Sequence, residues 1–133
     1  MLKLSLAAAV AAFAVAAQAQ DLTAGDATAG EKVFRKCQAC HMVGEDAKNR
    51  VGPHLNDLIG RTPGAVEDFN YSDAMTEFGA SNVWDVPTLA EYLRAPRELV
   101  PGTKMAFAGL RKDEEIADVL AYLAQYDAEG LSM

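Results

Sequence analysis

The feature that most constrains this chain is a C-x-x-C-H run formed by Cys37, Cys40 and His41. The chain of 133 residues has no other cysteine. A disulfide across so short a loop would remove little entropy from the unfolded chain and would stabilise the fold little. The run is instead typical of covalent attachment of a c-type haem. Two thiols can add to the two vinyl groups on one edge of the porphyrin, and the imidazole that follows can reach the iron.

Three other interpretations of the run are open. A thioredoxin-like redox pair opens a helix after a strand, whereas these cysteines are expected to close a helix. A zinc site needs four ligands, and His41 and His54 are the two histidines that could join the cysteines. The third alternative is a chance match.

The second axial ligand decides between electron transfer and ligand chemistry. A methionine there fills the site and raises the potential, whereas an open position favours ligand binding or peroxide chemistry. Two of the five methionines stand at the ends of the chain, and Met42 is tied to the wrong side by its neighbour His41. Met75 and Met105 remain, and residue chemistry alone does not separate them.

The N-terminal residues predict export. Lys3 precedes an apolar run over residues 4–17, and Ala17 and Ala19 form a small-x-small cleavage site. We expect a signal peptide over residues 1–19, cleaved near Ala19, and a mature periplasmic domain over 20–133. The alternative is an uncleaved anchor. The net charge of −7 excludes binding of nucleic acid or an anionic membrane through the overall field.

Capping and breaking residues predict an all-α domain of three to four helices. Asp26 or Thr28 caps the first helix, a short one spans 72–78, Asp85 caps the next, and the last begins near Asp113. No segment convincingly predicts a strand.

Long loops connect these helices. Six glycines and prolines interrupt residues 42–70, and residues 100–109 also form a loop. Long loops without regular structure are uncommon in a compact domain unless they are functional or wrap something. We expect these loops to close around one large apolar ligand, the covalent haem.

Several further segments have a specific sequence: GEKVF at residues 30–34, VGPHL at 51–55, IGR at 59–61, NYSDA at 70–74 and PGTKMAFAG at 101–109. With the C-x-x-C-H run, they resemble the class I c-type cytochromes of the mitochondrial and purple-bacterial type. The resemblance runs in collinear order over about residues 25–126. It implies the class I cytochrome c fold, one haem c attached through Cys37 and Cys40, and electron transport.

The resemblance also implies roles for individual residues. His41 and Met105 become the axial iron ligands. The carbonyl of Pro53 is expected to accept the Nδ1–H of His41. The Tyr92 hydroxyl is expected to bond the Met105 sulfur, with Thr103 in the same network. Burying a propionate is costly unless it is paired, and the partners implied for the propionates are Arg61, Tyr71 and Trp84.

One departure from the family concerns Met75, which stands where many relatives carry an asparagine in the distal water network. The effect of this methionine on the network does not follow from the sequence.

The function that the resemblance implies is one-electron transfer by a soluble, monomeric periplasmic protein that is not an enzyme. The donor would be a cytochrome bc complex, and the acceptor a reaction centre or terminal oxidase. Alternatives are a small haem peroxidase or ligand sensor, a subunit of a larger dehydrogenase, and a four-helix-bundle cytochrome, in which the motif lies near the C-terminus. Basic residues expected around the exposed haem edge form a docking face: Lys36, Arg97, Lys104, Arg111 and Lys112.

Overall fold

The computed structural model describes residues 9–11 and 24–133. The predicted signal peptide lies outside the described residues, apart from residues 9–11. Within the part that is described, no helix is long and apolar enough to cross a membrane.

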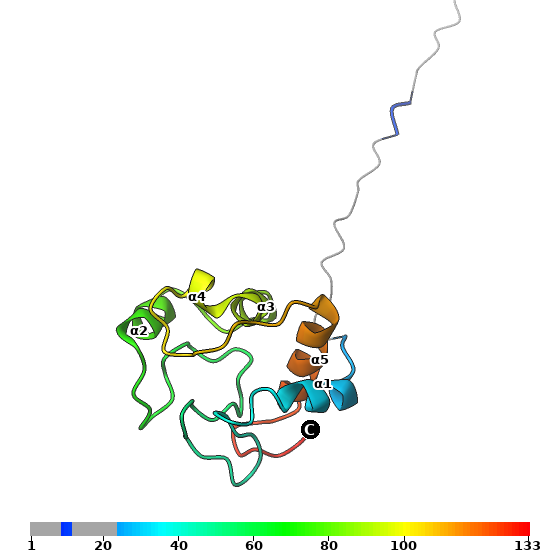
Figure 1. The fold of residues 1–133 in the computed structure, drawn as a ribbon. Helices are drawn as coiled ribbons and strands as arrows, with labels where there is room; N and C mark the ends of the chain where they lie inside the picture. The colour runs from blue at the N-terminus through cyan, green and yellow to red at the C-terminus, as the bar shows by residue number, and fades with distance from the viewer. Residues whose placement is uncertain (1–8, 12–23) are drawn as a thin grey trace, which may run out of the picture.

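The described residues form an all-α fold, as predicted (Figure 1). They contain no named strand, and the sole β-type pairing among them is an isolated bridge between Tyr126 and Ser132. The helices in chain order are α1 (Ala27–Phe34), α2 (Asp73–Gly79), α3 (Val86–Arg94), α4 (Pro96–Leu99) and α5 (Asp113–Leu123).

Side-chain caps explain where three of the helices begin. The Asp26 carboxylate accepts the N–H of Thr28 at 2.8 Å at the start of α1. The Ser72 hydroxyl accepts the N–H of Met75 at 3.0 Å in α2, and Asp85 caps α3 in the same way. Each cap satisfies an N–H that the first turn of a helix leaves without a partner. These predicted starts are confirmed.

One predicted boundary is wrong. Helix α1 ends at Phe34, so Cys37 and Cys40 lie in the turns that follow the helix and do not close it. Helix α3 ends at Arg94, and Pro96 beyond it opens the single turn of α4. Proline suits this first helical position because its missing N–H would have no partner there.

Helices α1 and α5 cross at one side of the molecule (Figure 1). A Cβ on Gly30 would collide with the carbonyl of Asp118, so the absence of a side chain permits this close approach. The rings of Phe34 and Tyr122 pack beside it with centroids 5.4 Å apart. The apolar stripe of α5 is buried: Ile116, Val119, Leu120 and Leu123.

The loops complete the domain. Residues 42–57 run along one side, and residues 60–64 cross to the opposite side, where α2, α3 and α4 and the loop over residues 100–112 lie (Figure 1). The crossing of α1 and α5 joins these two sides. The predicted long loops therefore face each other across the centre of the molecule.

Candidate functional site

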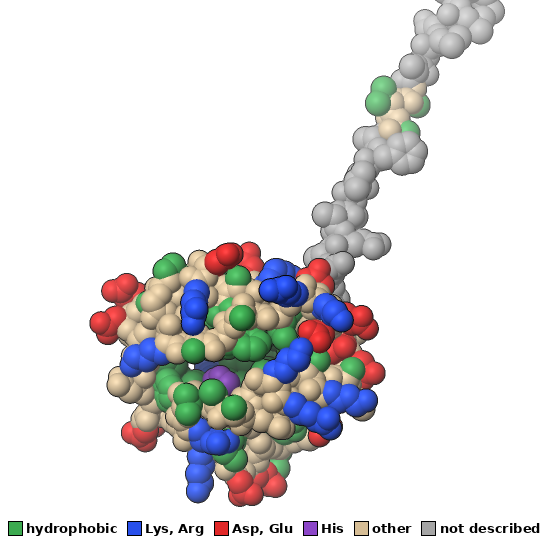
Figure 2. Space-filling view, viewed as in Figure 1, with side chains coloured by type: hydrophobic (Ala, Val, Ile, Leu, Met, Phe, Trp, Pro, Cys, Tyr) green, Lys and Arg blue, Asp and Glu red, His purple; other side chains and the backbone are tan. Residues whose placement is uncertain are grey.

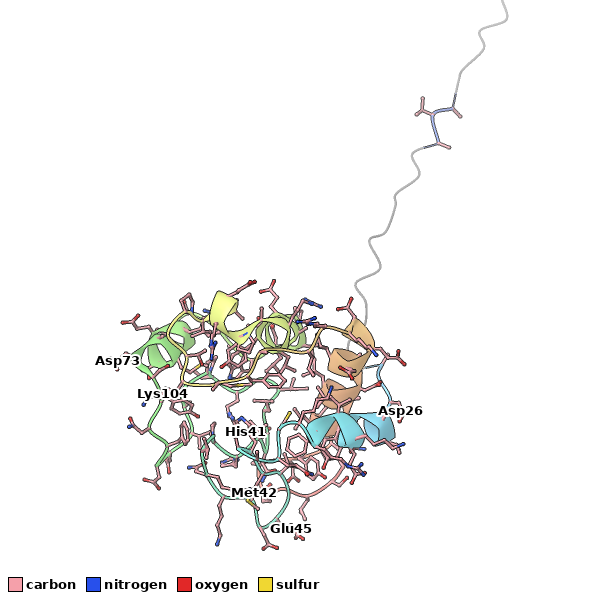
Figure 3. All side chains as sticks on the ribbon, viewed as in Figure 1. Asp26, His41, Met42, Glu45, Asp73 and Lys104 are labelled. Carbon is pink, nitrogen blue, oxygen red and sulfur yellow. The ribbon has the colours of Figure 1, made fainter. Side chains whose placement is uncertain are left out.

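A hollow opens between the two sides, and Figure 2 shows apolar side chains along it with a histidine inside. Figure 3, in the same orientation, places His41 there. Partly buried apolar side chains that pack against the core from the segments around the hollow include Cys37, Leu55, Ile59, Met105 and Phe107. An apolar surface of this kind suits a large apolar ligand.

The His41 imidazole is held by a hydrogen bond to Pro53 and by the close approach of Gly52 to its ring. Its Nδ1 lies 2.7 Å from the carbonyl oxygen of Pro53, the contact that was expected. When Nδ1–H donates to this carbonyl, Nε2 is left as the unprotonated nitrogen that a metal needs. A Cβ on Gly52 would overlap the imidazole ring.

The environment of His41 favours its neutral form. Burial lowers the pKa of the imidazole, the bond to Pro53 opposes this shift, and the charge of Arg61 adds to it. Only the neutral ring offers a lone pair to a metal ion.

The two cysteines are partly buried and are not joined by a disulfide. Burial raises the pKa of the Cys37 thiol to about 11, although Lys36 lowers it. Reactive thiols of redox C-x-x-C pairs have lowered pKa values, so this environment argues against the thioredoxin-like alternative. No group of three or more His, Cys, Asp or Glu residues in the described ranges could hold a metal ion, which argues against zinc.

Arg61 is a partly buried cation without a carboxylate partner among the described residues. Its Nη1 donates to the carbonyls of His54 at 3.1 Å and Asn56 at 3.0 Å. Burial lowers its pKa. A buried charge is costly unless it is paired, so this guanidinium is suited to bind an anion.

Tyr71 and Trp84 lie close to Arg61. The backbone N–H of Trp84 donates to the carbonyl of Arg61 at 2.9 Å. The Tyr71 hydroxyl accepts the N–H of Val66 at 3.2 Å, which leaves its own hydrogen free to donate, and the charge of Arg61 opposes the rise that burial causes in its pKa. Within the described chain the Trp84 indole N–H donates to no protein acceptor. Such donors suit carboxylates like the haem propionates.

The expected bond from Tyr92 to the Met105 sulfur is not present among the described residues. The Tyr92 hydroxyl instead pairs with Thr103 Oγ1 at 2.8 Å. Thr103 Oγ1 also accepts the backbone N–H of Met105 at 3.3 Å. A hydroxyl is a better acceptor than a thioether, which explains the difference. Tyr92 thus reaches Met105 indirectly, through its backbone.

The two candidate methionines differ in their surroundings. Met75 is 8% exposed and belongs to the buried core through α2. Met105 is half-buried in the loop over residues 100–112. The neighbouring Lys104 donates to the carbonyls of Asn70 at 3.3 Å and Tyr71 at 3.5 Å, so this loop is joined to the segment before α2.

Lysine and arginine side chains surround the hollow, and acidic side chains lie mainly at the margins of this face (Figure 2). One member of the predicted docking face is already paired, because Lys36 Nζ lies 3.2 Å from a carboxylate oxygen of Glu115. The other predicted members are exposed: Arg97, Lys104, Arg111 and Lys112.

Two polar residues near His41, His54 and Asn56, have buried side-chain atoms that the sequence did not predict. His54 Nδ1 is buried and has no hydrogen-bond partner. Asn56 is 6% exposed, and its side chain bonds the backbone of Gly44. Both lie in an irregular loop, where periodicity does not distinguish buried polar residues from exposed ones.

Taken together, the residues around the hollow fit a covalent haem. The cysteines and His41 stand at one wall, and Gly52 leaves room for the imidazole. Arg61 is a cation with no carboxylate partner in the described part of the chain. The apolar lining matches the porphyrin.

Comparison with known proteins agrees with this geometry. Residues 27–127 match the family model described as Cytochrome c. The chain is 55% identical over 104 residues to a protein named cytochrome c2 from Afifella marina, with 77% of this chain and 84% of the relative covered. It is 51% identical to cytochrome c-550 from Ancylobacter novellus, covering 76% of this chain and 95% of the relative.

A solved structure is similar as well. The structure of cytochrome c2 from Rhodospirillum centenum superposes with a TM-score of 0.73 at 38% identity, and covers 77% of this chain and 99% of that one.

Proposed function

Because the chain belongs to the cytochrome c family, as a class I c-type cytochrome that carries electrons and is not an enzyme, we propose that it moves single electrons in the periplasm. The proposed donor is a cytochrome bc complex, and the proposed acceptor is a reaction centre or a terminal oxidase. Residues 1–19 serve as the signal peptide in this proposal, and residues 20–133 act as a monomer.

The family carries a covalently attached haem c, and the C-x-x-C-H run of this chain supplies its attachment cysteines. The bound haem supplies reversible one-electron chemistry at iron. We propose that His41 and Met105 are its axial ligands. The observation that carries the proposal is the 2.7 Å contact between His41 Nδ1 and the Pro53 carbonyl, which leaves Nε2 free inside the apolar hollow.

The remaining site residues would stabilise the haem propionates and orient the two ligand side chains. The Pro53 carbonyl fixes the plane of the imidazole and raises its basicity. Arg61, Tyr71 and Trp84 offer a cation and two hydrogen-bond donors to the propionates. Thr103 holds the backbone of Met105, and Tyr92 holds Thr103.

Partner docking would use the predicted docking face, whose basic residues are expected around the exposed haem edge. Arg97, Arg111 and Lys112 are exposed, and the chain as a whole is acidic. A basic rim on an acidic molecule orients it toward an acidic partner surface before contact. Such docking is expected to be fast, weak and sensitive to salt.

A stopped-flow series over ionic strength tests this docking. Arg97→Glu is expected to slow second-order electron transfer to the natural partner at low salt. Glu129→Lys serves as the control, because Glu129 lies in the C-terminal segment (residues 124–133) and is not part of the predicted docking face. The differences should shrink with salt as the Debye length falls from about 30 Å at 0.01 M to about 8 Å at 0.15 M.

The wild-type rate gives the decisive sign. We expect it to fall as salt is added, because opposite charges attract across the docking site. A wild-type rate that rises with salt would mean that like charges face each other, and the basic docking face would then be rejected.

A further inference from the structure

The C-terminal segment lies against the loop that follows the C-x-x-C-H run (Figure 1). Gly130 is buried at a φ of +77°, and a Cβ there would collide with the carbonyl of Gly44. The carbonyl of Tyr126 accepts the N–H of Asp57 at 3.1 Å. This segment is therefore packed directly on the loop over residues 42–57.

The C-terminal segment is itself a folded turn. The Asp127 carboxylate accepts the N–H groups of Glu129 at 3.0 Å and Leu131 at 2.8 Å. The N–H of Gly130 donates to the Asp127 carbonyl at 3.0 Å. These bonds fix Gly130 in its left-handed conformation, so the segment presents a defined backbone surface to Gly44.

On the inner side of the same loop, Asn56 holds Gly44. The Asn56 carboxamide accepts the Gly44 N–H at 2.9 Å and donates to the Gly44 carbonyl at 2.9 Å. The side chain is 6% exposed. A buried amide that uses both its donor and its acceptor on one residue fixes the backbone there strongly.

These bonds continue a ladder between residues 40–44 and 52–56. The N–H of Gly52 donates to the Cys40 carbonyl at 2.9 Å, and the N–H of Leu55 donates to the Met42 carbonyl at 3.0 Å. His41 and Pro53 lie between these two rungs. The contact between His41 Nδ1 and the Pro53 carbonyl therefore depends on how closely residues 40–44 and 52–56 are held together.

We propose that Asn56 is a positioning residue for His41, and that Gly130 supports it from outside by keeping Gly44 in place. Asn56 closes the open end of the ladder, and the closed ladder keeps the Pro53 carbonyl on His41 Nδ1. This inference rests on the proposed role of His41 as an axial ligand.

The test uses the full haem-loaded protein and three variants. Asn56→Ala removes the last rung. Gly130→Ala displaces Gly44 and leaves Asn56 intact, so the outcome does not depend on one variant folding. Gly64→Ala is the matched control: its φ of +80° brings the same backbone strain, but its Cβ would come no closer than 3.2 Å to another atom.

Two readouts separate positioning from general destabilisation. The first is solvent exchange of the His41 Nδ1 proton in the reduced protein, followed by NMR. We expect it to accelerate about tenfold or more in Asn56→Ala and Gly130→Ala, beyond the change in Gly64→Ala, because the local opening becomes easier. The second is the reduction potential, which should rise in Asn56→Ala and in Gly130→Ala, since a weaker bond to Pro53 makes the imidazole a poorer donor to ferric iron.

Other outcomes overturn the proposal. If the three variants lose unfolding free energy but the exchange and the potential change no more in Asn56→Ala and Gly130→Ala than in the control, Asn56 has only a structural role. If the wild-type protein shows no protected His41 Nδ1 proton, the bond to Pro53 is not kept in the haem-loaded protein and the inference fails, whereas the ligand role of His41 is tested separately by the optical spectrum.

Discussion

The segment over residues 37–57, which carries His41, and the segment over residues 100–112, which carries Met105, are held in different ways. We call them the proximal and distal segments. The proximal segment is tied by backbone rungs from Gly52 to Cys40 and from Leu55 to Met42 on either side of His41. In the distal segment the Met105 N–H reaches a side chain, Thr103 Oγ1, at 3.3 Å.

The distal segment has its backbone anchors toward its ends. The N–H of Thr103 donates to the Val100 carbonyl at 3.0 Å, and that of Leu110 donates to the Leu93 carbonyl at 2.8 Å. Between them the chain depends on side chains, including the exposed Lys104. The fold itself therefore positions the imidazole, while the thioether is held by contacts that a single substitution can remove.

The largest expected effect is loss of the attachment itself. In the double variant Cys37→Ser, Cys40→Ser no thioether can form, so acid–acetone extraction should remove all the haem. The wild-type protein should keep its haem through the same treatment. Haem that stays on the double variant would contradict covalent attachment at this run.

Substitution of the two candidate methionines should change different properties of the protein. Met105→Ala should open the iron to carbon monoxide and lower the potential, because a methionine ligand raises it. Met75→Ala should leave the iron closed but lower the unfolding free energy by about 2–5 kcal/mol, as expected for truncating a buried methionine. Carbon monoxide titration and urea unfolding check both. The reverse pattern would assign the ligand role to Met75.

Smaller effects are expected where side chains hold the distal segment. Thr103→Val leaves both the Tyr92 hydroxyl and the Met105 N–H without their partner, and should lower the unfolding free energy by about 1–3 kcal/mol. Tyr92→Phe removes one hydroxyl and should lower it by about 1 kcal/mol. Thr103→Val should also accelerate carbon monoxide binding more than Tyr92→Phe does. Equal binding rates in both variants would show that Thr103 does not hold Met105.

The smallest expected effect is a pH dependence in the proximal segment. Burial, aided by the charge of Arg61, lowers the pKa of His54 below its ordinary value. The unfolded chain then binds the proton more readily, so the unfolding free energy should fall as the pH drops below about 6.5. His54→Gln should flatten this part of the profile and leave values above pH 8 little changed. An unchanged slope between pH 7 and 5 would mean that His54 contributes nothing.

Local signals explain how much of the fold could be predicted. Asp26, Ser72 and Asp85 begin helices where the sequence indicates, because a cap depends on residues two or three positions away. The contact between His41 and Pro53 was expected from the resemblance, and the resemblance depends on a short run of residues.

Features that depend on distant residues could not be predicted. The resemblance implied that Tyr92 and Thr103 share a network, but not that the two hydroxyls pair directly, which joins α3 to the distal segment. The packing of Gly130 on Gly44 joins residues that are far apart in the chain. In each case the partner is selected by the tertiary arrangement, and no period or motif in the sequence carries that information.

The proposed ligation by His41 and Met105 is tested most directly by the optical spectrum of the oxidised protein. We expect a weak charge-transfer band near the red edge of the visible spectrum, from a methionine sulfur bound to ferric iron. The band should persist in Met75→Ala and disappear in Met105→Ala. A wild-type spectrum without the band, or a Met105→Ala spectrum that keeps it, would contradict the proposed ligation.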